Sequence, residues 1–199
     1  MKGYLLIFIY CTLASLTGFA DGWELVKDKN GLKIYLRPTE GSPYKTYKGE
    51  AVLTMKMEDL YGVLIDVGNY DKWVYECSES RLLSKVDHRE YTYYSVMHLP
   101  FPFDNRDMTT TMKVSNSNDT IYLATKLKKP DTPQPKGIVG ITAYDELTTL
   151  IRIDDRHVRM IMVGYFEPGG SLPAWLMNMF LSEGPYESIM KIKELFETK

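Results

Sequence analysis

The sequence predicts an α+β fold of the helix-grip kind, in which a strongly curved antiparallel β-sheet wraps around a long C-terminal helix. Residues 74–166 read almost entirely as strands, and turn signals such as Asp87-His88 and 116–119 separate them at the spacing of an antiparallel meander. The long helical pattern comes last in the chain, at 172–197. Because a sheet has a face to bury and this is the only long helix expected, we expect the sheet to curve around it.

The terminal helix is predicted to begin at a sharp turn. Residues 158–166 carry apolar and β-branched side chains typical of a strand, and Pro168 followed by Gly169-Gly170 supplies a breaker and permissive backbone dihedrals. Ser171 is the expected N-cap. The segment 172–181 is apolar on nearly every side, so this part of the helix needs cover on more than one face.

Shorter elements with strand or helix periodicity precede this region. They are hairpin strands at 23–28 and 32–37, a long strand at 44–55, a helix at 57–67 and a helical turn at 70–73. Asp145-Glu146 predicts a turn between two strands, because such residues are favoured in turns for backbone reasons. Pro185 predicts a kink in the terminal helix.

The first 20 residues have the layout of a secretory signal peptide. Lys2 precedes an apolar run at 4–16, and Gly18-Phe19-Ala20 predicts cleavage after Ala20, which leaves a domain at 21–199. An uncleaved membrane anchor is the alternative, but the run is shorter than the ~20 apolar residues of a bilayer span. We therefore expect an exported protein, periplasmic or secreted if the source is bacterial.

Charge and cysteine content exclude further classes. Removing Lys2 with the signal peptide leaves 23 of the 24 basic residues against 26 acidic ones, a net charge of −3, so nucleic acid is not an expected partner. Cys11 leaves with the signal peptide and Cys77 remains alone, so no disulfide is predicted.

Neither a metal site nor a catalytic constellation is predicted. His88, His98 and His157 lie far apart, without a second His or Cys at ligand spacing. The chain also has no nucleophile elbow and no glycine-rich phosphate loop. We expect no cofactor, no metal and no enzymatic activity.

Arg106-Asp107 is a charged pair that follows a proline- and phenylalanine-rich loop. Neighbours on a strand point to opposite faces, so the two side chains need separate partners. Arg106 shares its face with Met108 and Met112, where an unpaired charge is costly. Two interpretations stay open: Arg106 pairs with a carboxylate at the edge of the sheet, or it contacts the head group of a ligand.

The methionines point to an apolar pocket. The chain has 11, and their flexible, polarizable side chains suit both core gaps and promiscuous apolar surfaces. Pairs on two strands and on the terminal helix are placed to line one volume: Met108 and Met112, Met160 and Met162, Met177 and Met179. Each one alone is well explained as core, but the set together with the apolar helix favours a pocket for a hydrophobic ligand.

Four landmarks, in this order and spacing, resemble the START domain, the steroidogenic-acute-regulatory-protein-related lipid-transfer family. They are Trp23, Tyr70-x-x-Trp73, Arg106-Asp107, and Gly169-Gly170-Ser171-Leu172-Pro173 followed by Asn178. The resemblance covers residues 22–197. It implies a curved sheet gripping the terminal helix, a tunnel that holds one lipid, and a gate made by that helix and the loop 99–105.

The resemblance also implies roles for single residues. Met108 and Met112 would face the tunnel, and Trp175, Leu176 and Met179 would lie in the lid helix. One departure leaves the ligand class open. Sterol-binding members carry an Arg shortly after the Arg-Asp pair and an acid on the neighbouring strand, whereas 109–112 has no Arg and 91–96 has no acid.

We predict that the protein binds a lipid or lipid-like ligand, which it carries or senses, with transient contact to membranes. The expected ligand-binding residues are Trp73, Phe101, Phe103, Arg106, Met108, Met112, Met162, Leu172, Trp175, Leu176 and Met179. Gly169-Gly170 and Gly184-Pro185 are the expected hinges. A helix-grip enzyme of the cyclase or hydrolase kind is the alternative, marked by an inward-facing carboxylate such as Asp107. A structural or protein-binding module with a filled core is the third interpretation.

Overall fold

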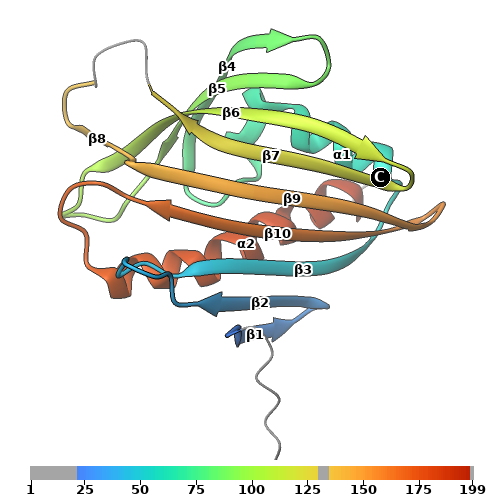
Figure 1. Ribbon diagram of the computed structural model, residues 1–199, viewed down its shortest axis with the longest axis horizontal. Helices are drawn as coiled ribbons and strands as arrows, with labels where there is room; N and C mark the ends of the chain where they lie inside the picture. Colours follow the sequence, from blue (N-terminus) through green and yellow to red (C-terminus); the bar gives the residue numbers. More distant parts are fainter. Residues whose placement is uncertain (1–21, 130–134, 198–199) are drawn as a thin grey trace, which may run out of the picture.

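The computed structural model describes residues 22–129 and 135–197, so the predicted signal peptide at 1–20 lies outside the described residues. A 10-stranded sheet curves around the long helix α2 (Figure 1). The elements in chain order are β1 Glu24–Lys29, β2 Leu32–Arg37, β3 Thr46–Thr54, α1 Met57–Ile65, the 3-10 helix η1 Val67–Lys72, β4 Cys77–Val86, β5 Glu90–Met97, β6 Asn105–Ser117, β7 Thr120–Lys128, β8 Ile138–Gly140, β9 Ala143–Asp154, β10 His157–Glu167 and α2 Ala174–Glu197.

The strand order confirms the predicted helix-grip fold. It runs β1-β2-β3-β10-β9-β7-β6-β5-β4, and neighbours along this path are antiparallel. The meander therefore extends from β4 to β10, interrupted by the short β8, which pairs with β6 in parallel. The N-terminal strands join the sheet because β3 pairs with β10, the last strand in the sequence.

Alternation along the strands buries the face of the sheet that meets α2. In β2, Leu32, Ile34 and Leu36 are buried, while the residues between them are exposed or half-buried. Ile189 and Ile192 of α2 belong to the same core and are fully buried. Each such side chain stabilises the fold by about 1.5–3 kcal/mol.

The start of α2 differs from the prediction. The helix begins at Ala174, and Ser171 is not its N-cap. Instead, the backbone N–H groups of Leu176 and Met177 donate to the carbonyl of Pro173, at 3.1 and 3.2 Å. Proline suits this boundary because its fixed φ fits the first turn and it has no N–H for the helix to leave unpaired.

The turn before α2 needs both of its glycines, as predicted. Gly169 and Gly170 have φ values of +65° and +59°, a left-handed conformation that other residues rarely adopt. A Cβ atom on Gly169 would also lie 2.3 Å from the carbonyl oxygen of Gly140, which rules out any side chain there.

One further prediction stays open and another is wrong. α2 continues through Pro185, which packs against β3: a Cβ atom on Gly49 would lie 3.5 Å from the Cβ of Pro185. The predicted kink at Pro185 stays a prediction. Asp145 and Glu146 lie inside β9 rather than in a turn. Both are held in the ladder by β10 on one side and β7 on the other, and this pairing outweighs their turn preference.

Candidate functional site

A cavity of about 170 Å³ lies between the sheet and α2. Strands on one side, the segment 73–77 and the middle of α2 form its walls. The lining residues are Tyr47, Leu64, Tyr70, Trp73, Val74, Tyr75, Cys77, Tyr93, Ser95, Val96, Met97, Met108, Met112, Leu123, Thr125, Ile141, Tyr144, Glu146, Thr148, Met162, Phe166, Phe180, Leu181, Gly184, Pro185 and Ser188.

The size and polarity of the cavity limit what it holds. An engineered cavity of about 150 Å³ in another protein binds benzene, so this one accommodates a ring or a short chain as it stands. Most of its wall is aromatic or aliphatic, which favours hydrophobic ligands. A ligand with a longer chain requires α2 or the neighbouring loops to move outward.

Glu146 reaches the cavity because of the strand register. Residues directly opposite one another in an antiparallel pair project from the same face of the sheet. Glu146 of β9 pairs with Gly164 of β10 and with Thr125 of β7, and Gly164 pairs in turn with Tyr47 of β3. This register brings Tyr47, Glu146 and Thr125 into one row across four strands, and all three line the cavity.

Three hydroxyl groups donate hydrogen bonds to the Glu146 carboxylate. Oε2 accepts from the hydroxyls of Tyr47 and Tyr144, the latter at 3.1 Å, and Oε1 accepts from Thr148 at 3.2 Å. Tyr47 reaches across β10 because the residue there is glycine: a Cβ atom on Gly164 would lie 2.6 Å from the Tyr47 ring. We call Glu146, Tyr47, Tyr144 and Thr148 the Glu146 site.

Burial dominates the electrostatics of this site. It raises the pKa of Glu146, although the three hydroxyl donors act in the opposite direction. Burial, followed by the charge of Glu146, raises the pKa of both Tyr47 and Tyr144. Among the described residues that line the cavity, Glu146 is the only Asp or Glu, and none is Lys, Arg or His. Its carboxylate therefore has hydroxyl partners but no basic partner in the cavity wall.

Apart from Arg106, the predicted site residues fall into three groups. Trp73, Met108, Met112 and Met162 line the cavity. Their role in ligand binding stays a prediction.

The second group packs beneath the start of α2. Leu172 and Leu176 are buried with Leu99, Met177 and Phe180, and we call these five residues the entry cluster. Phe103 is half-buried against it. Phe180 also lines the cavity, so the entry cluster and the cavity share a wall.

The third group points to solvent. The exposed fractions of Phe101, Trp175 and Met179 are 97%, 68% and 46%. Sequence periodicity alone does not separate Trp175 and Met179 from Leu176 and Phe180, because 172–181 is apolar on nearly every side.

Arg106 lies outside the cavity wall and is 3% exposed. Its guanidinium donates to the carbonyls of Pro168 at 2.7 Å, Asp104 at 2.5 Å and Gly169 at 3.4 Å. These partners are backbone carbonyls rather than the carboxylate or ligand head group considered from the sequence. Arg106 thus holds the turn before α2 to the loop before β6.

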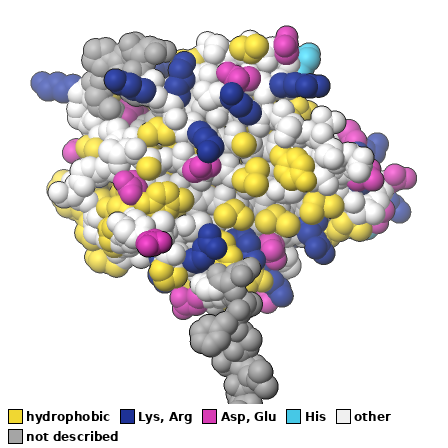
Figure 2. Space-filling view, in the orientation of Figure 1, with side chains coloured by type: hydrophobic (Ala, Val, Ile, Leu, Met, Phe, Trp, Pro, Cys, Tyr) yellow, Lys and Arg dark blue, Asp and Glu magenta, His cyan; other side chains and the backbone are white. Residues whose placement is uncertain are grey.

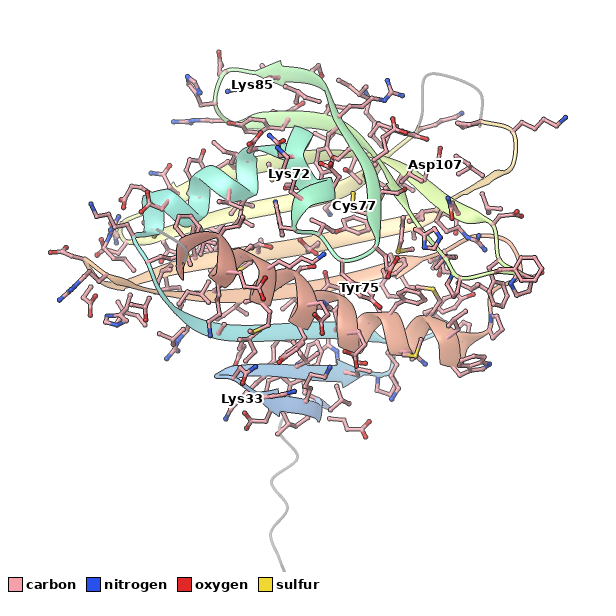
Figure 3. The ribbon with its side chains drawn as sticks, turned by 180° about the vertical axis from the view of Figure 1, so that it is seen from behind. Lys33, Lys72, Tyr75, Cys77, Lys85 and Asp107 are labelled. Carbon is pink, nitrogen blue, oxygen red and sulfur yellow. The ribbon has the colours of Figure 1, made fainter. Side chains whose placement is uncertain are left out.

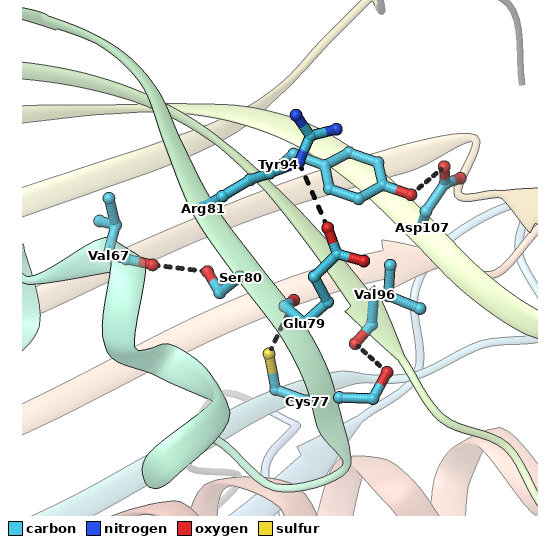
Figure 4. Close-up of polar contacts among 9 residues, drawn as sticks. Val67, Cys77, Glu79, Ser80, Arg81, Tyr94, Val96 and Asp107 are labelled. Atoms are coloured by element: carbon cyan, nitrogen blue, oxygen red, sulfur yellow. Dashed lines mark hydrogen bonds and ion pairs between the residues drawn. The ribbon is translucent and has the colours of Figure 1, made fainter. Parts of the chain in front are cut away.

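The inward carboxylate is Glu146, which the sequence analysis missed. Asp107, the acid considered there, does not line the cavity, and its Oδ2 accepts a hydrogen bond from the Tyr94 hydroxyl at 3.0 Å (Figure 4). The signal for Glu146 is its place in an alternating run. Tyr144, Glu146 and Thr148 share one parity with the buried Leu150, which marks the face that meets the core.

A second pocket, of about 320 Å³, adjoins the cavity. Val74, Tyr75 and Cys77 line both, and Figure 3 shows Tyr75 beside α2. We call this the outer pocket; its remaining lining residues are Asp71, Glu76, Ser78, His98, Glu187 and Lys191. The dividing segment is fastened to α2, because the backbone N–H of Tyr75 donates to Ser188 Oγ at 2.9 Å.

Neither nucleophile nor metal chemistry is supported at this wall. Burial raises the pKa of the Cys77 thiol to about 11, and the thiol donates to the Glu79 carbonyl at 3.3 Å (Figure 4). Within residues 22–129 and 135–197, no three His, Cys, Asp or Glu side chains are grouped to hold a metal ion. No helix in the same ranges is long and apolar enough to span a bilayer.

Comparisons with known proteins agree with this geometry. The START domain model matches residues 12–196. The uncharacterized protein PA1579 of Pseudomonas aeruginosa is 28% identical over 184 residues, which cover 90% of this chain and 89% of that protein. Mouse phosphatidylcholine transfer protein is 27% identical over 179 residues, which cover 85% of this chain and 80% of that protein.

A solved structure extends the likeness to three dimensions. The STAR-related lipid transfer protein of Xanthomonas axonopodis superposes with a TM-score of 0.82 at 30% identity, covering 89% of this chain and 99% of that one. The family model spans most of the chain, and the sheet and terminal helix have the predicted helix-grip arrangement. The chain belongs to the START domain family.

Proposed function

We propose that the protein binds one lipid or lipid-like amphiphile between the sheet and α2 and carries it between membranes. The observation that supports this most directly is the largely apolar cavity closed by a helix whose first turns are themselves apolar. Burial of a few hundred Å2 of ligand surface at ~25 cal/mol per Å2 offsets the cost of immobilising the ligand. Relatives named as lipid transfer proteins support the same ligand class.

The exposed residues near the start of α2 suit contact with a membrane. Phe101, Trp175 and Met179 expose large apolar surfaces, and Figure 2 shows hydrophobic side chains gathered where α2 begins. Aromatic side chains insert favourably at the boundary between lipid head groups and acyl chains. We infer that this end docks on the bilayer when a ligand enters or leaves.

Opening would involve the first turns of α2. The entry cluster contains two loop residues, Leu99 and Leu172, and is otherwise packed by half-buried residues from loops and from the ends of β5 and β10, so we expect it to open more readily than the part of the helix in the main core. The left-handed Gly169-Gly170 turn is the candidate hinge. Since the cavity holds only a small ring or short chain in this conformation, a diacyl lipid requires such a movement.

A second candidate function is an enzyme in which Glu146 acts as a general acid or base. The raised pKa of a carboxyl group inside a cavity favours this role. Against it, none of the other described lining residues is a His, Lys or Asp that would complete a catalytic pair. Mass spectrometry of the bound ligand before and after incubation with the protein separates the two, since an enzyme converts its ligand and a carrier returns it unchanged.

The carrier proposal is tested on full-length protein purified from its own host. Native mass spectrometry followed by lipid extraction should detect one bound amphiphile. Met112→Trp, which fills the cavity, should abolish this occupancy, whereas Lys113→Trp, the exposed neighbour on β6, should retain it. A protein recovered without lipid, and without binding across a lipid panel at micromolar concentration, would refute the proposal.

A further inference from the structure

We propose that the Glu146 site binds a cationic nitrogen, so that the preferred ligand is an amphiphile whose head group is an ammonium group. The inference rests on the proposed function and adds the head-group class to it. The site consists of one carboxylate, two tyrosines that donate to it and one threonine, all on the wall of an otherwise largely apolar cavity.

The charge of Glu146 is not balanced by any described residue of the cavity wall. A carboxylate moved out of water costs several kcal/mol unless it takes up a proton or a cation compensates its charge. Hydroxyl donors satisfy the oxygens of Glu146 but bring no positive charge, and none of the described lining residues is basic. A ligand cation supplies the missing charge.

The groups around the Glu146 carboxylate suit a cationic nitrogen. Oε2 accepts two hydrogen bonds and Oε1 accepts one, so Oε1 keeps acceptor capacity for an N–H donor. Tyrosine rings also attract cations, and Tyr70 and Tyr93 join Tyr47 and Tyr144 in the cavity wall. A protonated amine can donate an N–H to Oε1 and also lie against the tyrosine rings. A quaternary ammonium group has no N–H, so it is attracted by the negative charge and the rings alone.

The cavity wall does not suit an anionic head group. Arg106 does not line the cavity, and its guanidinium already donates to the carbonyls of Pro168, Asp104 and Gly169. A phosphate or carboxylate in the cavity would therefore face Glu146 with no described basic residue in the wall. A phospholipid could enter only with its phosphate held away from the cavity wall. The site therefore favours a ligand whose head group carries a positive charge and no negative charge.

The outer pocket carries more acidic than basic side chains, which suits a cationic ligand. Asp71, Glu76 and Glu187 line it against a single lysine, Lys191. His98 lies 3.2 Å from Glu76, so one of the three carboxylates has an imidazole partner. An acidic pocket raises the local concentration of cations and steers them, here toward the shared wall at Val74, Tyr75 and Cys77.

The test compares ligands that share a dodecyl chain and differ only in the head group. Dodecylamine, dodecyltrimethylammonium, dodecanol and dodecanoate are titrated into full-length protein below their micelle concentrations, with Trp73 in the cavity wall as a fluorescent reporter and calorimetry as a second readout. We expect both cations to bind about tenfold or more tightly than dodecanol, and dodecanoate to bind weakest.

Glu146→Gln should remove this preference while leaving dodecanol affinity within about threefold of its original value. Asp145→Asn is the matched control, because it removes the same charge from the neighbouring position on β9, where Asp145 is exposed and paired with Lys126 at 3.1 Å. The control should keep the preference.

The outcomes separate the two proposals. If dodecanol and dodecanoate bind as tightly as the cations, the cation site is wrong and the carrier proposal stands. If the preference survives Glu146→Gln, the cation is bound elsewhere and the Glu146 site is wrong. If none of the four probes binds, the cation site is wrong, and the carrier proposal is decided separately by native mass spectrometry and the lipid panel. The comparison of probes on the unsubstituted protein stays decisive even if the variant does not fold.

Discussion

The two halves of α2 are built on different supports. The anchor half, residues 186–196, buries Tyr186, Ile189 and Ile192 in the main core, where the helix contacts β2 and β3. The entry half, residues 174–181, buries Leu176 in the entry cluster, reaches the main core only at its last residue, Leu181, and exposes Trp175. A segment packed on loops opens at lower free energy than one packed on a sheet. The helix thus combines a fixed end and an end suited to opening, with the cavity between them.

Ile189→Ala should have the largest effect on stability. The side chain is fully buried in the main core, and its truncation leaves a void that the sheet cannot fill, so we expect a loss of about 2–5 kcal/mol in the free energy of unfolding. Urea denaturation followed by circular dichroism measures this loss. Leu195→Ala, on the exposed side of the same half, should change stability by less than about 0.5 kcal/mol. Equal losses would mean that the anchor half is not held by its buried face.

Leu176→Ala should cost less, at about 2 kcal/mol, because the loops around the entry cluster can relax into the space. The more telling measurement is hydrogen exchange. We expect faster exchange across residues 174–181 and unchanged protection across 186–196. A uniform rise in exchange rate along the whole helix would show that the two halves open together and do not differ in local stability.

The strand-turn-helix junction was predictable because its causes are local. Proline and two glycines mark the turn wherever they occur, and the left-handed φ values of Gly169 and Gly170 need those residues. The exact first residue of α2 was harder to predict from the sequence. Ser171 has the usual side chain of an N-cap, but the carbonyl of Pro173 begins the ladder, and only the backbone path decides between them.

The Glu146 site was missed because its causes are non-local. Asp145-Glu146 has the composition of a turn, and pairing with β7 and β10 is what holds the two residues in a strand. Tyr47, one of the two tyrosines that donate to Glu146, lies 99 positions away in sequence, and its contact depends on the missing side chain of Gly164. Register and side-chain packing of this kind appear only once the sheet is assembled.

Glu146→Gln tests the electrostatics of the cavity, which lies between the sheet and the middle of α2. Because the pKa of Glu146 is raised above its ordinary value of 4.5 on folding, the native state binds this proton more tightly than the unfolded state. The associated stability is fully present below about pH 4.5 and is lost as the pH rises through the raised pKa.

The glutamine variant does not titrate, so it should be more stable than the original protein by about 1 kcal/mol at neutral pH, as is common when a buried charge is replaced by a neutral group of similar shape. The difference should shrink to nothing in acid. Thermal unfolding at pH 7 and pH 4 measures it, with Asp145→Asn as the control. A variant that is less stable at both pH values would show that the carboxylate is structural.

Trp175→Ala should have the smallest effect on stability and a clear effect on membranes. The side chain is 68% exposed, so the free energy of unfolding should change by less than about 0.5 kcal/mol. If the entry half docks on a bilayer, loss of this indole should weaken binding to lipid vesicles about tenfold, because the buried apolar area of one large side chain is lost. Co-sedimentation with vesicles measures the change.

Leu195→Ala serves as the matched control on the anchor half, since Leu195 is also exposed, at 42%, and should leave vesicle binding unchanged. Similar losses for both variants would place membrane contact along the whole helix, and the entry half would no longer be distinct. A loss confined to Trp175→Ala, together with fast hydrogen exchange at 174–181, would identify the end that opens as the end that meets the membrane. The cavity would then load from the bilayer through the entry half while the anchor half holds the fold closed.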